Sequence, residues 1–312
     1  MSILVGTDDG LYTLGEEVRA DLRGHKVGSL VSDSKAIWAL ADGVTIYGRG
    51  SLGIWRMRSR IVGKRSKLPR YDHAPLGTCI HPEPSGSILV GTTDAHLLRV
   101  EADGDWVERL DSFESVSGRD GWHTPWGDPA SVRSISVDQH GTVYVNVHVG
   151  GIPKSSDGGD TWVPTIDVAA DVHQVLAAPG SSSRVYAATA KGLAYSIDGG
   201  MTWDFRTDGL TGGYCRAVAA NADHVFVTAS DGPSGERAGI YRGQLTSGAF
   251  ERCSEGLPKS FDGNIDTHCL AADDSTVAFG TTDGQVYVSN DSGQSWREES
   301  SDLPAVRCLL ID

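Results

Sequence analysis

A short β-rich segment recurs seven times along the chain, and this repeat limits the fold more than any other feature of the sequence. Each copy is a run of apolar and β-branched residues followed within a few positions by Gly or Asp, and the copies begin at Ile3, Ile37, Ile88, Val143, Val185, Val225 and Val277. In a chain of 312 residues the mean spacing is about 45 residues, which is the length of one four-stranded propeller blade. Strands this closely spaced leave no room for βαβ units, so the sequence predicts an all-β fold.

One complete repeat shows how the four strands of a blade are arranged. Strands are expected at Val172–Pro179, Arg184–Thr189, Gly192–Ser196 and Thr202–Arg206. The last segment, Val306–Asp312, is a first strand with nothing after it, whereas the N-terminus begins at a second strand. We therefore predict a single domain, residues 1–312, that forms a seven-bladed propeller of four-stranded antiparallel blades. The C-terminal strand joins the three N-terminal strands in one blade, which closes the ring and protects the sheet edges.

Three of the turns between the third and fourth strands share a sharper motif. They read Ser155-Ser-Asp157-Gly-Gly-Asp-Thr-Trp162, Ser196-Ile-Asp198-Gly-Gly-Met-Thr-Trp203 and Ser289-Asn-Asp291-Ser-Gly-Gln-Ser-Trp296. This pattern resembles the Asp-box, or bacterial neuraminidase repeat, of sialidase-like propellers. The carboxylate and hydroxyl can bond turn amides, Gly can supply a positive φ, and the indole can wedge against a sheet. A structural role is therefore expected for Asp157, Trp162, Asp198, Trp203, Asp291 and Trp296.

The resemblance implies a fold rather than a reaction. Asp-boxes occur in sialidases, in other glycosidases and lyases, in receptors and in photosystem assembly factors. A sialidase of this superfamily needs an arginine triad, an early Arg-Ile-Pro, and a Tyr nucleophile with a Glu partner. This chain has Gly151-Ile152-Pro153 and no recognisable Tyr and Glu pairing. Sialidase activity is therefore not expected, and a glycosidase- or lyase-like activity stays open.

Composition narrows the location and the class of partner. The chain has 41 acidic and 27 basic residues and a formal charge of -14, which argues against nucleic acid or an anionic membrane as a partner. No apolar run approaches the roughly 20 residues of a membrane helix, and no basic and apolar leader precedes the first strand. Five cysteines without a CxxC spacing indicate a reducing compartment. We expect a soluble, cytoplasmic protein, and the sequence does not determine its oligomeric state.

Alignment of the seven innermost strands gives one column rich in basic side chains. Five strands contribute Arg or His at this position and the other two contribute Gly28 and Gly77; the five are Arg133, His173, Arg216, His268 and Arg307. One interpretation is a polar position near solvent. The other is a positive funnel at the mouth of the axial channel, which would bind a carboxylate, phosphate or sulfate. We adopt the second and expect a small anionic ligand, such as a sugar acid.

The connections that open on the same face supply further candidates. Aromatic faces suit sugar rings, and charged groups suit hydroxyls and anions. The substrate-binding set is therefore Arg133, Arg216, Arg307, His73, Trp122, His123, Trp126, His148 and Tyr214. A glycosidase needs two carboxyl groups, whereas a lyase needs one base with a group that neutralises the carboxylate. The catalytic candidates are Asp128, Asp262, Asp266, His173 and His268.

Two alternative functions remain open. Six of the ten histidines map to this face, so imidazoles from separate blades could bind a transition metal. The ligands would then be His148, His173 and His268, although the interleaved arginines would repel a cation, and the first hypothesis itself requires no cofactor. The third hypothesis is a non-catalytic propeller that docks a protein partner on its face.

Overall fold

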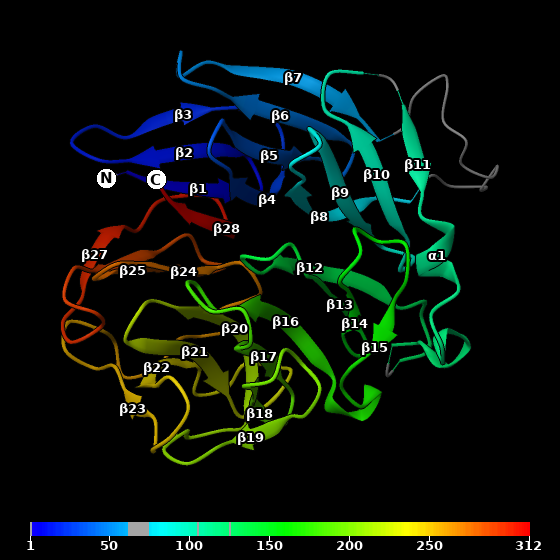
Figure 1. The fold of residues 1–312 in the computed structure, drawn as a ribbon. Helices are drawn as coiled ribbons and strands as arrows, with labels where there is room; N and C mark the ends of the chain where they lie inside the picture. The colour runs from blue at the N-terminus through cyan, green and yellow to red at the C-terminus, as the bar shows by residue number, and fades with distance from the viewer. Residues whose placement is uncertain (1, 62–74, 105, 125) are drawn as a thin grey trace.

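The chain forms a ring of seven sheets around a central axis. The structure is a computed structural model, and it describes residues 2–61, 75–104, 106–124 and 126–312. Within these residues 28 strands form seven sheets, each of four antiparallel strands, and Figure 1 shows the sheets following one another around the ring. The predicted seven-bladed propeller is confirmed. We number the blades from 1, which contains the N-terminal strands, to 7.

Each blade consists of four strands, which are named in order from the axis outward. Blade 1 contains β28 (Val306–Ile311), β1 (Ile3–Thr7), β2 (Gly10–Leu14) and β3 (Arg19–Asp21). Blade 2 contains β4 (Val27–Ser32), β5 (Ile37–Ala41), β6 (Thr45–Arg49) and β7 (Trp55–Arg60). Blade 3 contains β8 (Gly77–Pro82), β9 (Ser87–Thr92), β10 (Leu97–Glu101) and β11 (Val107–Arg109). Blade 4 contains β12 (Ser131–Val137), β13 (Val143–His148), β14 (Pro153–Ser155) and β15 (Val163–Pro164). Blade 5 contains β16 (Val172–Ala177), β17 (Val185–Thr189), β18 (Gly192–Ser196) and β19 (Asp204–Arg206). Blade 6 contains β20 (Tyr214–Ala220), β21 (His224–Ser230), β22 (Gly239–Gln244) and β23 (Glu251–Arg252). Blade 7 contains β24 (Leu270–Asp273), β25 (Thr276–Gly280), β26 (Val286–Ser289) and β27 (Arg297–Ser300).

Blade 1 combines the two ends of the chain. The C-terminal strand β28 pairs antiparallel with β1, so that Ile3 lies opposite Ile311. Ser2 and Asp312 exchange two backbone hydrogen bonds of 2.8 and 2.9 Å. The pairing gives β1 a partner on each side, because β2 occupies its other edge. The predicted ring closure is therefore present, and Figure 1 shows the two termini side by side.

Glycine in the second strand of some blades allows the next blade to approach closely. Gly280 ends β25, and a Cβ built on it would lie 2.6 Å from Cγ1 of Val306 in β28. The backbone there is an ordinary strand, so the requirement for Gly is steric rather than conformational. The Val-Gly-Thr and Phe-Gly-Thr repeats of the sequence thus mark the seams between blades. The following Thr281 receives a hydrogen bond from the backbone N–H of Gln285 and so supports the next turn.

Helical structure is slight in the described part of the chain. It consists of α1 (Asp111–Glu114) and the 3-10 segments η1 (Arg119–Gly121) and η2 (Val168–Ala170). None of these helices has the length or the apolar character that a membrane crossing requires.

The three Ser-x-Asp-x-Gly turns share one hydrogen-bond pattern. In the first, the Ser155 hydroxyl donates to Asp157, and Asp157 accepts from the backbone N–H and the hydroxyl of Thr161. The hydroxyl of Thr161, its backbone N–H and Ser155 lower the pKa of Asp157 to about 2. The carboxylates of Asp198 and Asp291 are bonded in the same way and their pKa values are also lowered to about 2. The three carboxylates are therefore hydrogen-bonded within their own turns.

Candidate functional site

The predicted basic column coincides with a set of β-bulges. In six of the seven innermost strands the pairing register shifts at the same level, and the strand gains an extra residue there. A bulge changes the direction of a side chain and ends regular pairing. The bulged positions contain Gly28, Thr78, Arg133, His173, Arg216 and Arg307. In blade 3 the extra residue is thus Thr78, and the assignment of Gly77 to this column was wrong by one residue.

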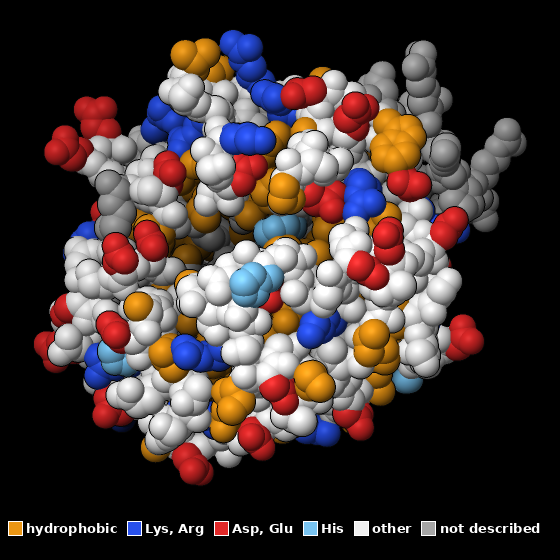
Figure 2. Space-filling model, in the orientation of Figure 1, with side chains coloured by type: hydrophobic (Ala, Val, Ile, Leu, Met, Phe, Trp, Pro, Cys, Tyr) orange, Lys and Arg blue, Asp and Glu red, His pale blue; other side chains and the backbone are white. Residues whose placement is uncertain are grey.

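A pocket of about 670 Å³ lies at this level. Its wall is built from the first residues of the innermost strands, the connections that precede them, and turns between second and third strands. Figure 2 shows the molecule in the orientation of Figure 1, with the ring hollowed at its centre. The charged residues of the lining are Lys26, Asp42, Arg133, Arg216, Asp266 and Arg307.

The three predicted arginines line the pocket but differ in their partners. Nε of Arg216 lies 2.7 Å from Oδ1 of Asp266, and Nε of Arg307 donates to Oδ1 of Asp8 at 2.8 Å. No carboxylate lies within ion-pair distance of Arg133 among the described residues. Burial, and then the nearby charge of Arg216, lower the pKa of Arg133. Arg133 is therefore a half-buried guanidinium whose charge has no paired carboxylate.

The segment before β24 forms hydrogen bonds to backbone carbonyls of three other blades. Nε2 of His268 donates to the backbone carbonyl of Arg133 at 2.9 Å. The Thr267 hydroxyl lies 3.0 Å from the carbonyl of His173 and 3.2 Å from that of Arg216. These bonds connect blade 7 to blades 4, 5 and 6. Burial lowers the pKa of His268, and its Nε2 proton is committed to a backbone carbonyl. His268 thus contributes to the wall of the pocket and holds its shape.

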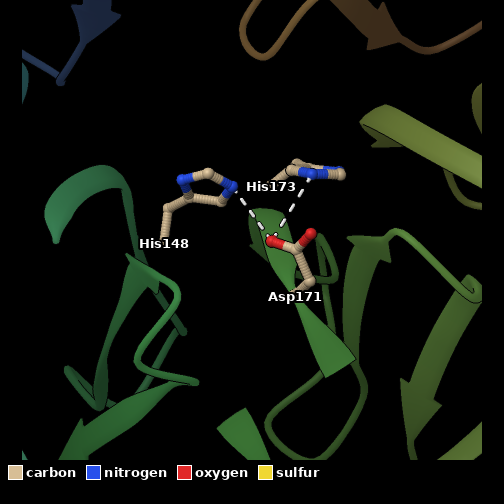
Figure 3. Close-up of side chains that lie close together, drawn as sticks. All are labelled: His148, Asp171 and His173. Carbon is tan, nitrogen blue, oxygen red and sulfur yellow. Dashed lines mark ion pairs between the residues drawn. The ribbon is translucent and has the colours of Figure 1, made fainter. Parts of the chain in front are cut away.

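A second cluster lies beside the pocket and includes a residue that the sequence analysis missed. His148 ends β13, Asp171 precedes β16, and His173 is the bulged residue of β16. Oδ1 of Asp171 lies 2.9 Å from Nε2 of His148 and 3.7 Å from Nε2 of His173 (Figure 3). The histidines are 2% and 0% exposed, respectively. His268, the predicted third metal ligand, is not part of this cluster.

The electrostatics of the cluster keep the imidazole of His173 neutral and the carboxylate of Asp171 charged. Burial, reinforced by Arg216 and Arg133, lowers the pKa of His173 to about 3. Burial also opposes ionisation of Asp171, but His148, His173 and Arg133 outweigh that effect and lower its pKa. The sequence carried no periodic signal for Asp171, because Asp171 precedes β16 with a positive φ of 51° and His173 lies at the bulge. Strand alternation therefore does not apply to this pair.

Aromatic rings link this cluster to the pocket. The ring of Trp126 lies 5.7 Å from that of His148, and the ring of Tyr214 lies 4.7 Å from that of His173. The guanidinium of Arg216 lies 5.7 Å from the centre of the Tyr214 ring. Trp126, which is 64% exposed, thus begins a continuous row of side chains that ends at the pocket wall.

The other predicted residues lie elsewhere. Trp122 packs against Phe113 at 5.8 Å and under the guanidinium of Arg119, so its ring belongs to the packing of blade 4. His123 is exposed and bonded to the carbonyl of Gly121. Asp128 and Asp262 are exposed and neither lines the pocket. His73 falls outside the described residues. Of the predicted carboxylates, only Asp266 lines the pocket.

Comparisons with known proteins place the chain in a structural class. No protein-family model matches, and no curated protein matches. Solved structures do resemble it: an ancestral GH74 enzyme (TM-score 0.63, 14% identity, 96% of this chain and 40% of that chain) and virginiamycin B lyase from Staphylococcus aureus (TM-score 0.60, 14% identity, 98% and 89%). YCF48 bound to D1 peptide is a third (TM-score 0.58, 15% identity, 93% and 87%). At these identities the likeness shows the fold alone. The chain spans less than half of the GH74 enzyme.

Proposed function

We propose that the protein binds a small organic anion, a sugar acid, in the axial pocket through the guanidinium of Arg133. The observation that carries this proposal is the absence of a carboxylate partner for Arg133 among the described residues. A desolvated cation without a partner destabilises a protein. A ligand carboxylate would supply the missing acceptor with two charge-assisted hydrogen bonds.

The charge and size of the pocket support the same ligand class. Four cationic and two anionic side chains line it, and Asp8, which pairs with both Arg307 and Lys26, adds a third carboxylate beside it. The cations therefore exceed the carboxylates by one in a protein of net charge -14. A volume of about 670 Å³ lies within the usual range for small-molecule sites.

The proposal includes processing of the bound anion by glycosidase- or lyase-like chemistry. Asp266 is the acid or base candidate that lines the pocket. Its Oδ1 lies 2.7 Å from Nε of Arg216, and this ion pair holds the carboxylate in position. Asp42 is the second carboxylate of the lining and is bonded to His25 at 2.6 Å. The enzymes GH74 and virginiamycin B lyase share the fold, which makes either chemistry compatible with this scaffold.

We also propose that the chain belongs to the Asp-box superfamily and functions in a reducing compartment such as the cytoplasm. The common hydrogen-bond pattern of the three turns supports the first point. The five cysteines are free and buried, which supports the second.

Calorimetric titration with D-glucuronate tests the proposal, and D-glucose is the matched neutral control. We expect saturable binding of glucuronate and none of glucose, and at least about tenfold weaker glucuronate binding in Arg133→Gln. Equal binding of both sugars, or glucuronate binding that Arg133→Gln leaves unchanged, would refute a carboxylate site at Arg133. If no sugar acid or simple carboxylate binds while a protein partner does, the propeller is an interaction scaffold instead.

A further inference from the structure

The cluster of His148, Asp171 and His173 has an unusual surplus of buried polar atoms. Nε2 of His173, Nδ1 of His148 and Oδ1 of Asp171 are buried and have no hydrogen-bond partner among the described residues. Among the described residues, Oδ1 of Asp171 makes ion-pair contacts of 2.9 Å to Nε2 of His148 and 3.7 Å to Nε2 of His173. Buried polar atoms without partners are rare in folded proteins, because each loses its contact with water. Two of the three, Nε2 of His173 and Oδ1 of Asp171, lie 3.7 Å apart beside Nε2 of His148, and an ion bound between these side chains would give both atoms a partner.

The tautomer of His173 places a lone pair toward Asp171. Its Nδ1 lies 2.6 Å from the backbone carbonyl of Cys215. A carbonyl only accepts hydrogen bonds, so Nδ1 carries the proton and Nε2 carries the lone pair. A backbone carbonyl that orients an imidazole in this way is the usual arrangement around metal-binding histidines.

From this geometry we propose that His148, Asp171 and His173 bind one divalent first-row transition-metal ion. The ligand atoms of the three side chains all lie within 4.8 Å of one another. Ligands at roughly 2.1 Å from an ion lie about 3 to 3.5 Å apart, and the present separations of 2.9 and 3.7 Å bracket that range. Two imidazoles and one carboxylate leave coordination positions open for water or a ligand.

The donor set and its surroundings select the class of ion. Imidazole nitrogen favours zinc, iron, cobalt and similar ions over magnesium and calcium, which prefer oxygen. The site offers one negative charge, from Asp171, and Arg133 and Arg216 lie near enough to act on His173. The arginines repel any divalent cation equally, but a transition-metal ion gains coordination energy from two imidazoles that offsets this repulsion, whereas magnesium or calcium does not. The inference stands on the cluster alone and does not depend on the anion-binding proposal.

The test is titration of the chelator-treated full chain with CoCl₂, followed by its visible absorption, and with ZnCl₂ by calorimetry. We expect one equivalent of either ion and a cobalt spectrum of low-coordinate nitrogen and oxygen ligation. Asp171→Asn keeps the side-chain shape, and His148→Gln removes an imidazole without touching the bond between His173 and Cys215. Each should weaken binding by about 100-fold or more.

The matched control is His140→Gln, which removes an exposed histidine outside the cluster. It should bind cobalt and zinc as the parent chain does. Circular dichroism and thermal melting of the metal-free variants establish that they fold. No binding by the parent chain, or equal affinity in the control, Asp171→Asn and His148→Gln, would overturn the proposal.

Discussion

The substitution Arg133→Gln should make the protein more stable while it weakens anion binding. Arg133 has no paired carboxylate among the described residues, and the charge of Arg216 lies close to it. The hydrogen bond from His268 goes to the backbone carbonyl of Arg133, so the substitution leaves this link between blades 7 and 4 in place. The neutral amide removes a half-buried cation that has no paired carboxylate, so we expect the free energy of unfolding to rise by about 1 kcal/mol, which corresponds to a melting temperature about 2 °C higher.

The effect on binding has the opposite sign. Hydrogen bonds to a charged partner contribute about 1.5 to 3 kcal/mol, so loss of the guanidinium should weaken D-glucuronate binding by about 10- to 150-fold. Arg216→Gln is the informative comparison because Arg216 is paired with Asp266 at 2.7 Å. That change leaves Asp266 without its partner and should lower the melting temperature.

Differential scanning calorimetry of the three proteins without ligand, followed by calorimetric titration, measures both effects. The surface variant Arg237→Gln, whose partner Asp231 lies outside the pocket, controls for a change of net charge. If Arg133→Gln melts at a lower temperature than the parent, as Arg216→Gln is expected to do, Arg133 is a structural residue and the reasoning fails.

Three further predictions concern the scaffold. Gly280→Ala forces a methyl group against Val306, so chemical denaturation should show that the free energy of unfolding falls by about 1 to 3 kcal/mol. An unchanged midpoint would show that the two blades can move apart without cost. Removal of residues 306–312 takes away the innermost strand of blade 1 and should abolish cooperative unfolding in calorimetry; a single sharp transition at the parent temperature would contradict the role of ring closure. Burial lowers the pKa of His81 to about 4, whereas its pKa in the unfolded chain is about 6.5. The contribution of the neutral imidazole to stability is therefore complete above pH 6.5 and is lost as the pH falls toward 4. The free energy of unfolding falls by up to about 1.4 kcal/mol per pH unit in that range. Melting temperatures between pH 7 and 4.5 should therefore fall less steeply in His81→Gln, and parallel curves would refute the assignment.

The strands and their order could be predicted from the sequence because the relevant signals are local. An apolar run followed by Gly or Asp specifies a strand and its turn wherever it occurs, and the expected third strand at Gly192–Ser196 matches β18 to the residue. The ring closure could also be predicted, since a lone first strand at one terminus and a missing first strand at the other have one obvious partner. The recurrence of Arg and His at one level of the innermost strands identified four residues of the pocket wall, Arg133, Arg216, His268 and Arg307.

The partners of those side chains were decided by the tertiary structure alone. Arg307 pairs with Asp8, which is 299 positions away, and Arg133 has no such partner among the described residues although its strand has the same pattern. Asp171 meets two histidines because β13 and β16 belong to adjacent blades, and His268 is diverted across the ring to the carbonyl of Arg133. Periodicity reports only which way a side chain points from its own strand. Charge pairing and metal ligation depend on distances of about 3 Å between atoms of different blades, and only closure of the ring sets those distances.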